Sequence, residues 1–154
     1  MGVSTHDMDA TIRFYDGVLG FPRVGDDRIR IKEGGVLRQV SFDVGGGQYM
    51  VFMESKGVRG IPGDYDTGIN RALGVPGGMY HFALRVLTLD GLESRRQELQ
   101  RHGIEVSPII DLETAKSIFF LDPNGIQLEL CCHTRAFDES DLRRESEASI
   151  ALPD

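Results

Sequence analysis

The chain has 154 residues with an apolar fraction of 40% and a charged fraction of 27%, values typical of one folded domain. Acidic residues outnumber basic residues by 24 to 17, giving a formal net charge of −7. This charge and the lack of a basic stripe argue against nucleic acid as a partner. No apolar run approaches the roughly 18 residues of a membrane helix, so no membrane partner is expected.

The N-terminus and the cysteines indicate the compartment. The first nine residues, MGVSTHDMD, lack the basic and apolar regions of a secretory signal. The two cysteines, Cys131 and Cys132, are adjacent, and neighbours on a strand point to opposite faces, so a disulfide between them is not expected. We therefore predict a cytoplasmic protein.

The first half of the chain predicts one helix followed by strands. Apolar residues recur at helical spacing over residues 8–19, with Asp7 as N-cap and Gly20 at the end. Residues 36–42 and 48–54 are rich in β-formers and flank a run of three glycines, so we predict a hairpin there and a weaker strand at 27–32.

The middle of the chain, residues 56–78, changes character because it is rich in glycine and proline. We expect a long, flexible connection with one short helix near 67–73. A long loop inside a compact domain is usually functional or disordered, and here we expect a lid over a site.

The second half repeats the order of the first. Its predicted elements are a strand at 79–87, a helix at 91–102 entered through a capping box of Asp90 and Glu93, a strand near 104–107, a strand at 114–121, a turn at 122–125 and a strand at 126–132. A polar tail, 134–154, follows as an appended helix or a disordered segment.

Each half is therefore a βαβββ module, with module one at 1–55, module two at 79–133 and a linker at 56–78 in one domain over 1–133. One such module cannot bury both faces of its sheet. We predict an α+β fold in which paired βαβββ modules form a curved mixed sheet, with helices on one face and an open concave face.

Strand alternation places two ligand-type side chains on that open face. Around His81 and around Glu129, one side of each strand is apolar and the other carries the polar residue. Two such strands in one curved sheet can direct an imidazole and a carboxylate at one point, which suits a metal ion. Taken alone, each residue is more often a half-buried or solvated strand residue, so their pairing carries the prediction.

The segments Tyr80–Val86 and Phe120–Leu130, with Asp7–Asp9 and Phe14–Phe21, resemble the vicinal oxygen chelate superfamily. That superfamily includes glyoxalase, bleomycin-resistance and fosfomycin-resistance proteins and extradiol dioxygenases. The resemblance covers about residues 2–133. It implies that His81 and Glu129 bind a divalent metal.

The repeat also predicts where further ligands lie. Asp90 follows His81 by nine residues and corresponds to Asp9, so the third ligand is expected just before Met1. His6 is a weak substitute for it. The position corresponding to Glu129 holds Val51, and this favours a three-ligand site of two histidines and a glutamate. Fe²⁺ or Mn²⁺ is favoured for such a site, with Zn²⁺ or Ni²⁺ as alternatives.

Other residues on the open face have two interpretations each. Glu129 and His133 are the predicted catalytic residues, His133 as a proton carrier or else an exposed strand end. Arg85 binds a substrate carboxylate or forms a salt bridge with a neighbouring strand. Cys131 is a substrate contact with a reactive thiol, or simply packs. Phe119 is predicted to line the substrate site, where the resemblance would place the tyrosine of extradiol dioxygenases.

Three functions follow for a homodimer that binds a small molecule. The first is a metal-dependent dioxygenase, lyase or isomerase in which a small substrate chelates the ion through two oxygens. The second is a metal-free binding protein of the bleomycin-resistance type. The third is a regulatory or degenerate domain.

Overall fold

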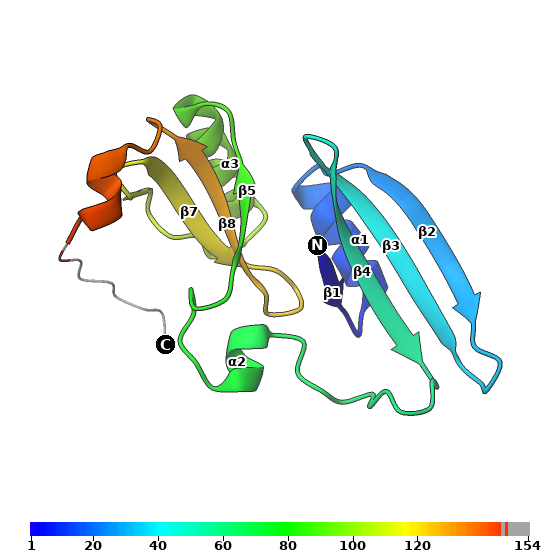
Figure 1. Ribbon diagram of the computed structural model, residues 1–154. Coiled ribbons are helices and arrows are strands. Elements are labelled where there is room, and N and C mark those ends of the chain that lie inside the picture. The colour runs from blue at the N-terminus through cyan, green and yellow to red at the C-terminus, as the bar shows by residue number, and fades with distance from the viewer. Residues whose placement is uncertain (146, 148–154) are drawn as a thin grey trace.

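The computed structural model describes residues 1–145 and 147. In chain order the elements are β1 (Gly2–Ser4), α1 (Met8–Ile12), the π-helical segment η1 (Arg13–Val18), β2 (Arg23–Arg30), β3 (Val36–Gly45), β4 (Gln48–Lys56), α2 (Ile69–Leu73), β5 (Phe82–Arg85), α3 (Leu89–Arg101), β6 (Ile110–Asp111), β7 (Ala115–Leu121), β8 (Gln127–His133) and the 3₁₀-helix η2 (Glu139–Arg143). They form two four-stranded sheets, ordered β1-β4-β3-β2 and β5-β8-β7-β6 (Figure 1).

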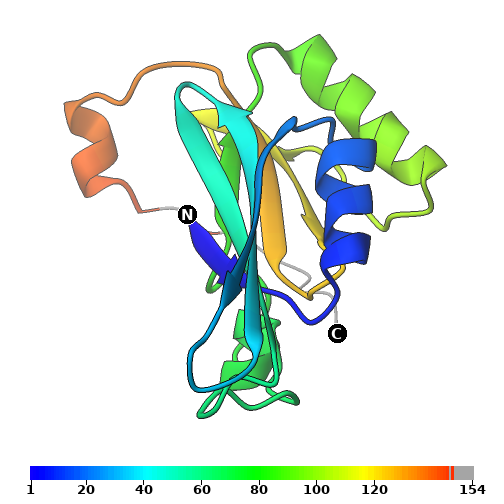
Figure 2. The same cartoon turned by 90° about the vertical axis from the view of Figure 1, so that its right-hand side faces the viewer.

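This arrangement confirms the predicted α+β fold of paired βαβββ modules. In both sheets the outer strand pairs in parallel with the last strand of its module, β1 with β4 and β5 with β8, and the other pairs are antiparallel. Helices α1 and α3 lie on the same side of the sheets (Figure 2). The opposite side is the open face.

The first helix differs from the single α-helix predicted over 8–19. It begins as predicted, because the Asp7 carboxylate accepts a hydrogen bond from the Ala10 N–H at 2.9 Å. After Ile12 the backbone widens into the π-helical segment, in which the Leu19 N–H donates to the carbonyl of Phe14 at 2.9 Å. This segment carries the fully buried Tyr15.

Three strands of the first sheet extend beyond their predicted bounds, and one of them is β4, which continues to Lys56. Strand β2 spans 23–30 instead of 27–32, and its residues are mostly exposed and charged, so alternation gives little signal at this edge. Strand β3 continues to Gly45, and a tight glycine turn connects it to β4.

The predictions for module two were wrong at three places. Strand β5 covers only 82–85 of the predicted 79–87. Helix α3 begins at Leu89, because the Thr88 hydroxyl, rather than a capping box at Asp90, accepts from the Gly91 N–H at 3.0 Å. Residues 104–107 form no strand.

Residues 104–107 lie beside β7 but form no strand with it. The reason is that the Ser107 side chain accepts a hydrogen bond that a strand partner would accept through its backbone. The Ser107 N–H donates to the carbonyl of Phe119 at 3.0 Å, but the Phe119 N–H donates to the Ser107 hydroxyl at 2.9 Å. Ile104 and Val106 still pack against the core. The edge strand of this sheet is β6 instead.

A buried polar cluster joins the two modules, and we call it the clasp; its members are Thr5, Thr11, Tyr15, Asp122 and Asn124. The Tyr15 hydroxyl donates to Oδ2 of Asp122 at 3.0 Å, and the Thr5 hydroxyl donates to Oδ1 of Asn124 at 2.6 Å. Burial raises the pKa of Asp122 above its ordinary value. The clasp fixes the turn before β8 against the first module.

The linker, which contains the predicted short helix as α2, contacts both modules. The imidazole of His6 lies 2.7 Å from the carbonyl of Tyr65. The Thr67 hydroxyl donates to the carbonyl of Asn124 at 2.8 Å. The lid role of this segment stays a prediction, and these contacts show that the linker is held against both modules.

Part of the predicted polar tail is ordered around η2. Arg135 pairs with Asp141 at 2.7 Å, and Arg144 pairs with Glu113. Residues 146 and 148–154 of that tail lie outside the described residues. Among the residues that the structure describes, no helix is long and apolar enough to cross a membrane.

Candidate functional site

The open face of the second sheet brings His81 and Glu129 together. Nε2 of His81 lies 3.0 Å from Oε2 of Glu129, and the Glu129 side chain is only 8% exposed. Glu129 lies opposite Ala83 on the neighbouring strand β5, and His81 precedes that strand by one residue. The two side chains thus meet at one point, as alternation predicts. Their role as metal ligands stays a prediction.

The linker and the turn before β5 hold His81. Asn70 of α2 donates from its amide to the carbonyl of Tyr80 and accepts from the Tyr80 N–H, both at 2.9 Å. This pair fixes the backbone beside His81. Nδ1 of His81 lies 2.9 Å from the carbonyl of Gly78. An imidazole that donates from Nδ1 to a carbonyl presents its Nε2 lone pair to a metal.

Glu129 is held by a third side chain, Ser117 of β7. The Ser117 hydroxyl donates to Oε1 of Glu129 at 2.5 Å, and Ser117 is fully buried. The two carboxylate oxygens therefore have different partners, Ser117 on Oε1 and His81 on Oε2. Such a buried carboxylate needs these partners, because an unpaired buried charge is costly.

Cys131 lies next along β8 on the same face. Burial, and secondly the charge of Glu129, raise the pKa of its thiol. The thiol therefore stays protonated at neutral pH, and this favours the packing interpretation of Cys131 over a reactive nucleophile.

Phe119 and Arg85 flank the His81–Glu129 pair. Phe119 lies directly opposite Glu129 in the strand register, and its ring centroid is 6.0 Å from that of His81 in an edge-on arrangement. Arg85 is exposed and lies opposite Cys131. Within the described part of the chain Arg85 forms no ion pair, so its guanidinium is available to an anion.

The structure does not bring His133 to this pair. His133 ends β8, is exposed, and its ring lies 6.5 Å from that of Phe137. Four residues of strand separate it from Glu129, which is about 13 Å along the sheet. The proton-carrier role of His133 has no supporting contact, and its position fits the exposed strand end.

The strand register shows which residues of the two modules correspond. Gly2 lies opposite Val51 in the first sheet, as Ala83 lies opposite Glu129 in the second. Val51 therefore takes the place of Glu129, and the counterpart of His81 falls one position before Met1. The substitute considered from the sequence, His6, contacts Tyr65 in the linker.

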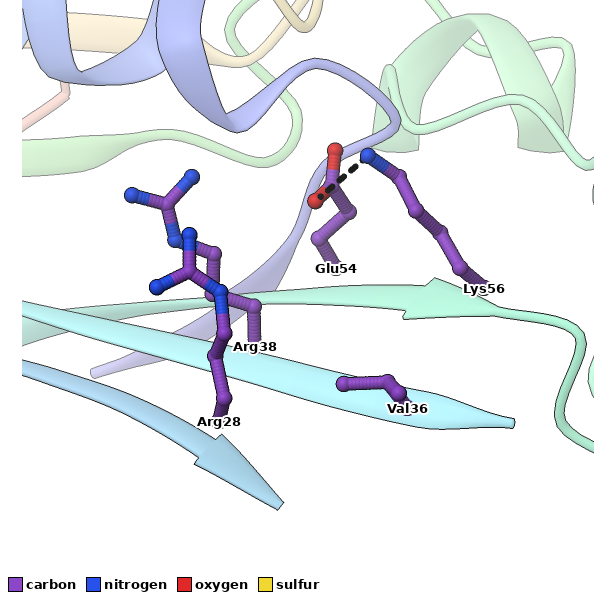
Figure 3. A pocket seen from close by; sticks show the side chains of 5 residues that line it. All are labelled: Arg28, Val36, Arg38, Glu54 and Lys56. Carbon is purple, nitrogen blue, oxygen red and sulfur yellow. Dashed lines mark ion pairs between the residues drawn. The ribbon is translucent and has the colours of Figure 1, made fainter. Parts of the chain in front are cut away.

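Glu54, the other buried glutamate, lies on the helix side of the first sheet. Its Oε1 accepts from the Met8 N–H at 3.2 Å, and its Oε2 lies 3.2 Å from Nζ of Lys56. It lines a cavity of about 100 Å³ with Arg28, Val36, Arg38 and Lys56 (Figure 3). Glu54 thus points away from the open face.

Two of the three basic side chains that line the cavity in Figure 3, Arg38 and Lys56, are paired with carboxylates. Arg38 forms two hydrogen bonds of 2.9 Å with Asp26, and Lys56 pairs with Glu54. We therefore place the candidate site at His81 and Glu129 instead. No group of three histidine, cysteine, aspartate or glutamate side chains that could hold a metal occurs among the described residues.

Two residues of the site were missed in the sequence. Strand alternation could have indicated Ser117, because it lies two residues before Phe119 and therefore on the same face of the strand. Asn70 carries no such signal, since its contact with Tyr80 depends on how the linker folds back.

Comparisons with known proteins place the fold in a family. The family model described as "Glyoxalase/Bleomycin resistance protein/Dioxygenase superfamily" matches residues 1–130. A search of the curated proteins found no match.

Three solved structures illustrate the similarity. The glyoxylase/bleomycin resistance protein/dioxygenase domain from Frankia sp. EAN1pec has 19% identity and a TM-score of 0.66, with 86% of this chain and 94% of that chain covered. The fosfomycin resistance protein FosX from Listeria monocytogenes has 15% identity and a TM-score of 0.60, with 87% and 90% covered. The antibiotic binding protein TnmS3 from Streptomyces sp. CB03234 has 19% identity and a TM-score of 0.58, with 87% and 93% covered.

At these identities the solved structures show the shared fold, whereas the family model spans most of the chain. The duplicated βαβββ modules, the open face and this match lead to one conclusion. The chain belongs to the Glyoxalase/Bleomycin resistance protein/Dioxygenase superfamily.

Proposed function

We propose that this protein is a divalent-metal-dependent enzyme that acts on a small substrate with two chelating oxygens, as a dioxygenase or as a lyase or isomerase. The observation that carries the proposal is the 3.0 Å approach of His81 Nε2 to Glu129 Oε2 on the open face. An imidazole and a carboxylate are suitable ligands for Fe²⁺ or Mn²⁺, and also for Zn²⁺ or Ni²⁺.

The two residues fit such an ion by their chemistry. The contact of Nδ1 with Gly78 and the hydrogen bond from Ser117 leave Nε2 of His81 and Oε2 of Glu129 directed at one another. Nε2 of His81 and Oε2 of Glu129 would hold the ion, which would supply Lewis-acid chemistry when bound. With two ligands from the described residues, positions are left for substrate oxygens.

Side chains around the pair suit a small anionic substrate with an apolar part. Arg85 has no ion-pair partner among the described residues, and a guanidinium can bind a carboxylate through two parallel hydrogen bonds. Phe119 presents an apolar ring beside His81. In this proposal Arg85 orients the substrate, and Phe119 restricts the access of water.

Metal binding by the purified protein tests the proposal. Equilibrium dialysis against Mn²⁺ is expected to give about one ion per site, and His81→Ala is expected to abolish this binding. His102→Ala is the matched control, because His102 is an exposed residue at the end of α3. Unchanged binding by His81→Ala, or no binding by the unmodified protein, would refute the proposal.

A second candidate function is a metal-free binding protein. It is favoured by one observation, namely that His81 and Ser117 already satisfy both oxygens of Glu129 without an ion. Binding of a hydrophobic antibiotic that is unaffected by EDTA would support this alternative, and loss of binding in EDTA would support the enzyme.

We also propose a cytoplasmic homodimer. Large apolar side chains, including Ile29, Tyr49 and Met53, are at least 44% exposed on the open face of the first sheet, and a second copy would cover them. Cys131 and Cys132 are free thiols, which suits a reducing compartment. Light scattering coupled to size exclusion should give twice the mass of the chain.

A further inference from the structure

We propose that Ser117 is a positioning residue that holds Oε1 of Glu129, so that the carboxylate presents a single oxygen, Oε2, to the bound cation. This inference rests on the proposed metal site and names a residue that determines how the site coordinates its ion.

The first support is the geometry of the hydrogen bond. The Ser117 hydroxyl lies 2.5 Å from Oε1 of Glu129, at the short end of the range for hydroxyl donors to charged oxygens. Ser117 is fully buried, and Glu129 is 6% exposed. Water therefore competes little for either group, and the bond fixes the rotation of the carboxylate.

The second support is that the two carboxylate oxygens of Glu129 have different partners. Oε2 faces His81 Nε2 at 3.0 Å, whereas Oε1 faces Ser117. The hydrogen bond from Ser117 withdraws charge from Oε1 and fixes its direction, so Oε2 is the better donor to an ion on the His81 side. The serine thus disfavours two-oxygen coordination and leaves a position open for the substrate.

The third support is the position of Ser117 in the sheet. It lies opposite Cys131, one same-face step along β8 from Glu129, so the hydrogen bond runs diagonally across the strands. At the matching position of the first sheet Gln39 lies opposite Met53. The serine therefore occurs in the module that carries the glutamate.

The experiment compares the metal affinity of the protein and of Ser117→Ala, measured by the free-ion EPR signal of Mn²⁺. We expect the alanine variant to bind Mn²⁺ about 10- to 100-fold more weakly. Ser117→Thr keeps a hydroxyl and is expected to recover most of that affinity. Ser41→Ala is the matched control, because Ser41 lies in β3 on the open face of the first sheet.

A crystal structure of metal-free Ser117→Ala gives a second measurement that needs no ion. The inference expects the Glu129 carboxylate to rotate and its Oε2 to leave hydrogen-bond distance of His81. It also shows whether the variant has folded.

The outcomes separate the inference from the proposed function. If the unmodified protein binds Mn²⁺ and Ser117→Ala binds equally well, the role of Ser117 is refuted and the metal site stands. If the unmodified protein binds no Mn²⁺, the metal enzyme is refuted. In that case an unmoved carboxylate in the Ser117→Ala crystal structure also refutes the positioning role.

Discussion

The two modules have one topology and different open faces. In the second sheet the positions around the last strand carry His81, Ser117 and Glu129, and the Glu129 carboxylate contacts both of the other side chains. In the first sheet the corresponding register positions of Glu129 and Ser117 carry Val51 and Gln39. The second copy of the duplicated fold thus carries a histidine–glutamate pair on its open face, and the first copy does not.

The buried glutamates show the same asymmetry. Glu129 lies on the open face, where its partners are a histidine and a serine. Glu54 lies on the helix side, where its partners are the Met8 N–H and Lys56. Two equally buried glutamates therefore have different partners. The face of the sheet decides whether the carboxylate reaches a histidine.

The largest expected effect comes from removing the charge of Glu129. Glu129→Gln keeps the shape of the side chain, and we expect the affinity for Mn²⁺ to fall at least 100-fold, or about 2.8 kcal/mol. Glu54→Gln is the control, since it removes a buried carboxylate from the opposite face. Isothermal titration would contradict the comparison if both variants lost the same affinity.

A smaller effect is expected from adding a histidine to the first module. A protein with a histidine added directly before Met1 places an imidazole at the counterpart of His81. We expect it to bind Mn²⁺ at least about 10-fold more tightly than the same protein with alanine added there. Removing His81 from the extended protein should cancel the gain. Equal affinities for the two extensions would show that the matching position contributes no ligand.

The smallest expected effect concerns the clasp, where the first module supplies hydroxyls and the second supplies the ionisable Asp122. Burial raises its pKa in the folded protein above the unfolded value near 3.8, so the folded state holds the proton more tightly. This contribution to stability is complete below about pH 3.8 and is lost as the pH rises through the folded pKa. Asp122→Asn should remove that decline.

Denaturant titrations between about pH 3 and about pH 7 would measure the contribution of Asp122. They give the difference in unfolding free energy between the protein and Asp122→Asn at each pH. As the pH rises, the unfolding free energy of the unmodified protein is expected to fall relative to that of Asp122→Asn. A difference that changes in the opposite direction would contradict the sign.

Sequence patterns predicted which side chains share a face of the sheet better than they predicted the element bounds. Period-two alternation placed His81 and Glu129 on one face, because neighbouring strand residues point to opposite sides regardless of the surroundings. The same rule separated Glu54 from Glu129. Bounds failed where side chains replace backbone partners, as at Thr88 before α3 and at Ser107 beside β7.

The sequence by itself determined the duplicated modules and the pair of ligand-type residues, because hydrophobic periodicity and turn residues act locally. Only the tertiary structure decided that Ser117 holds Glu129 and that Asn70 braces the backbone beside His81. The tertiary structure also placed His133 away from the pair. These outcomes depend on register and on how the linker folds back, which no local pattern encodes.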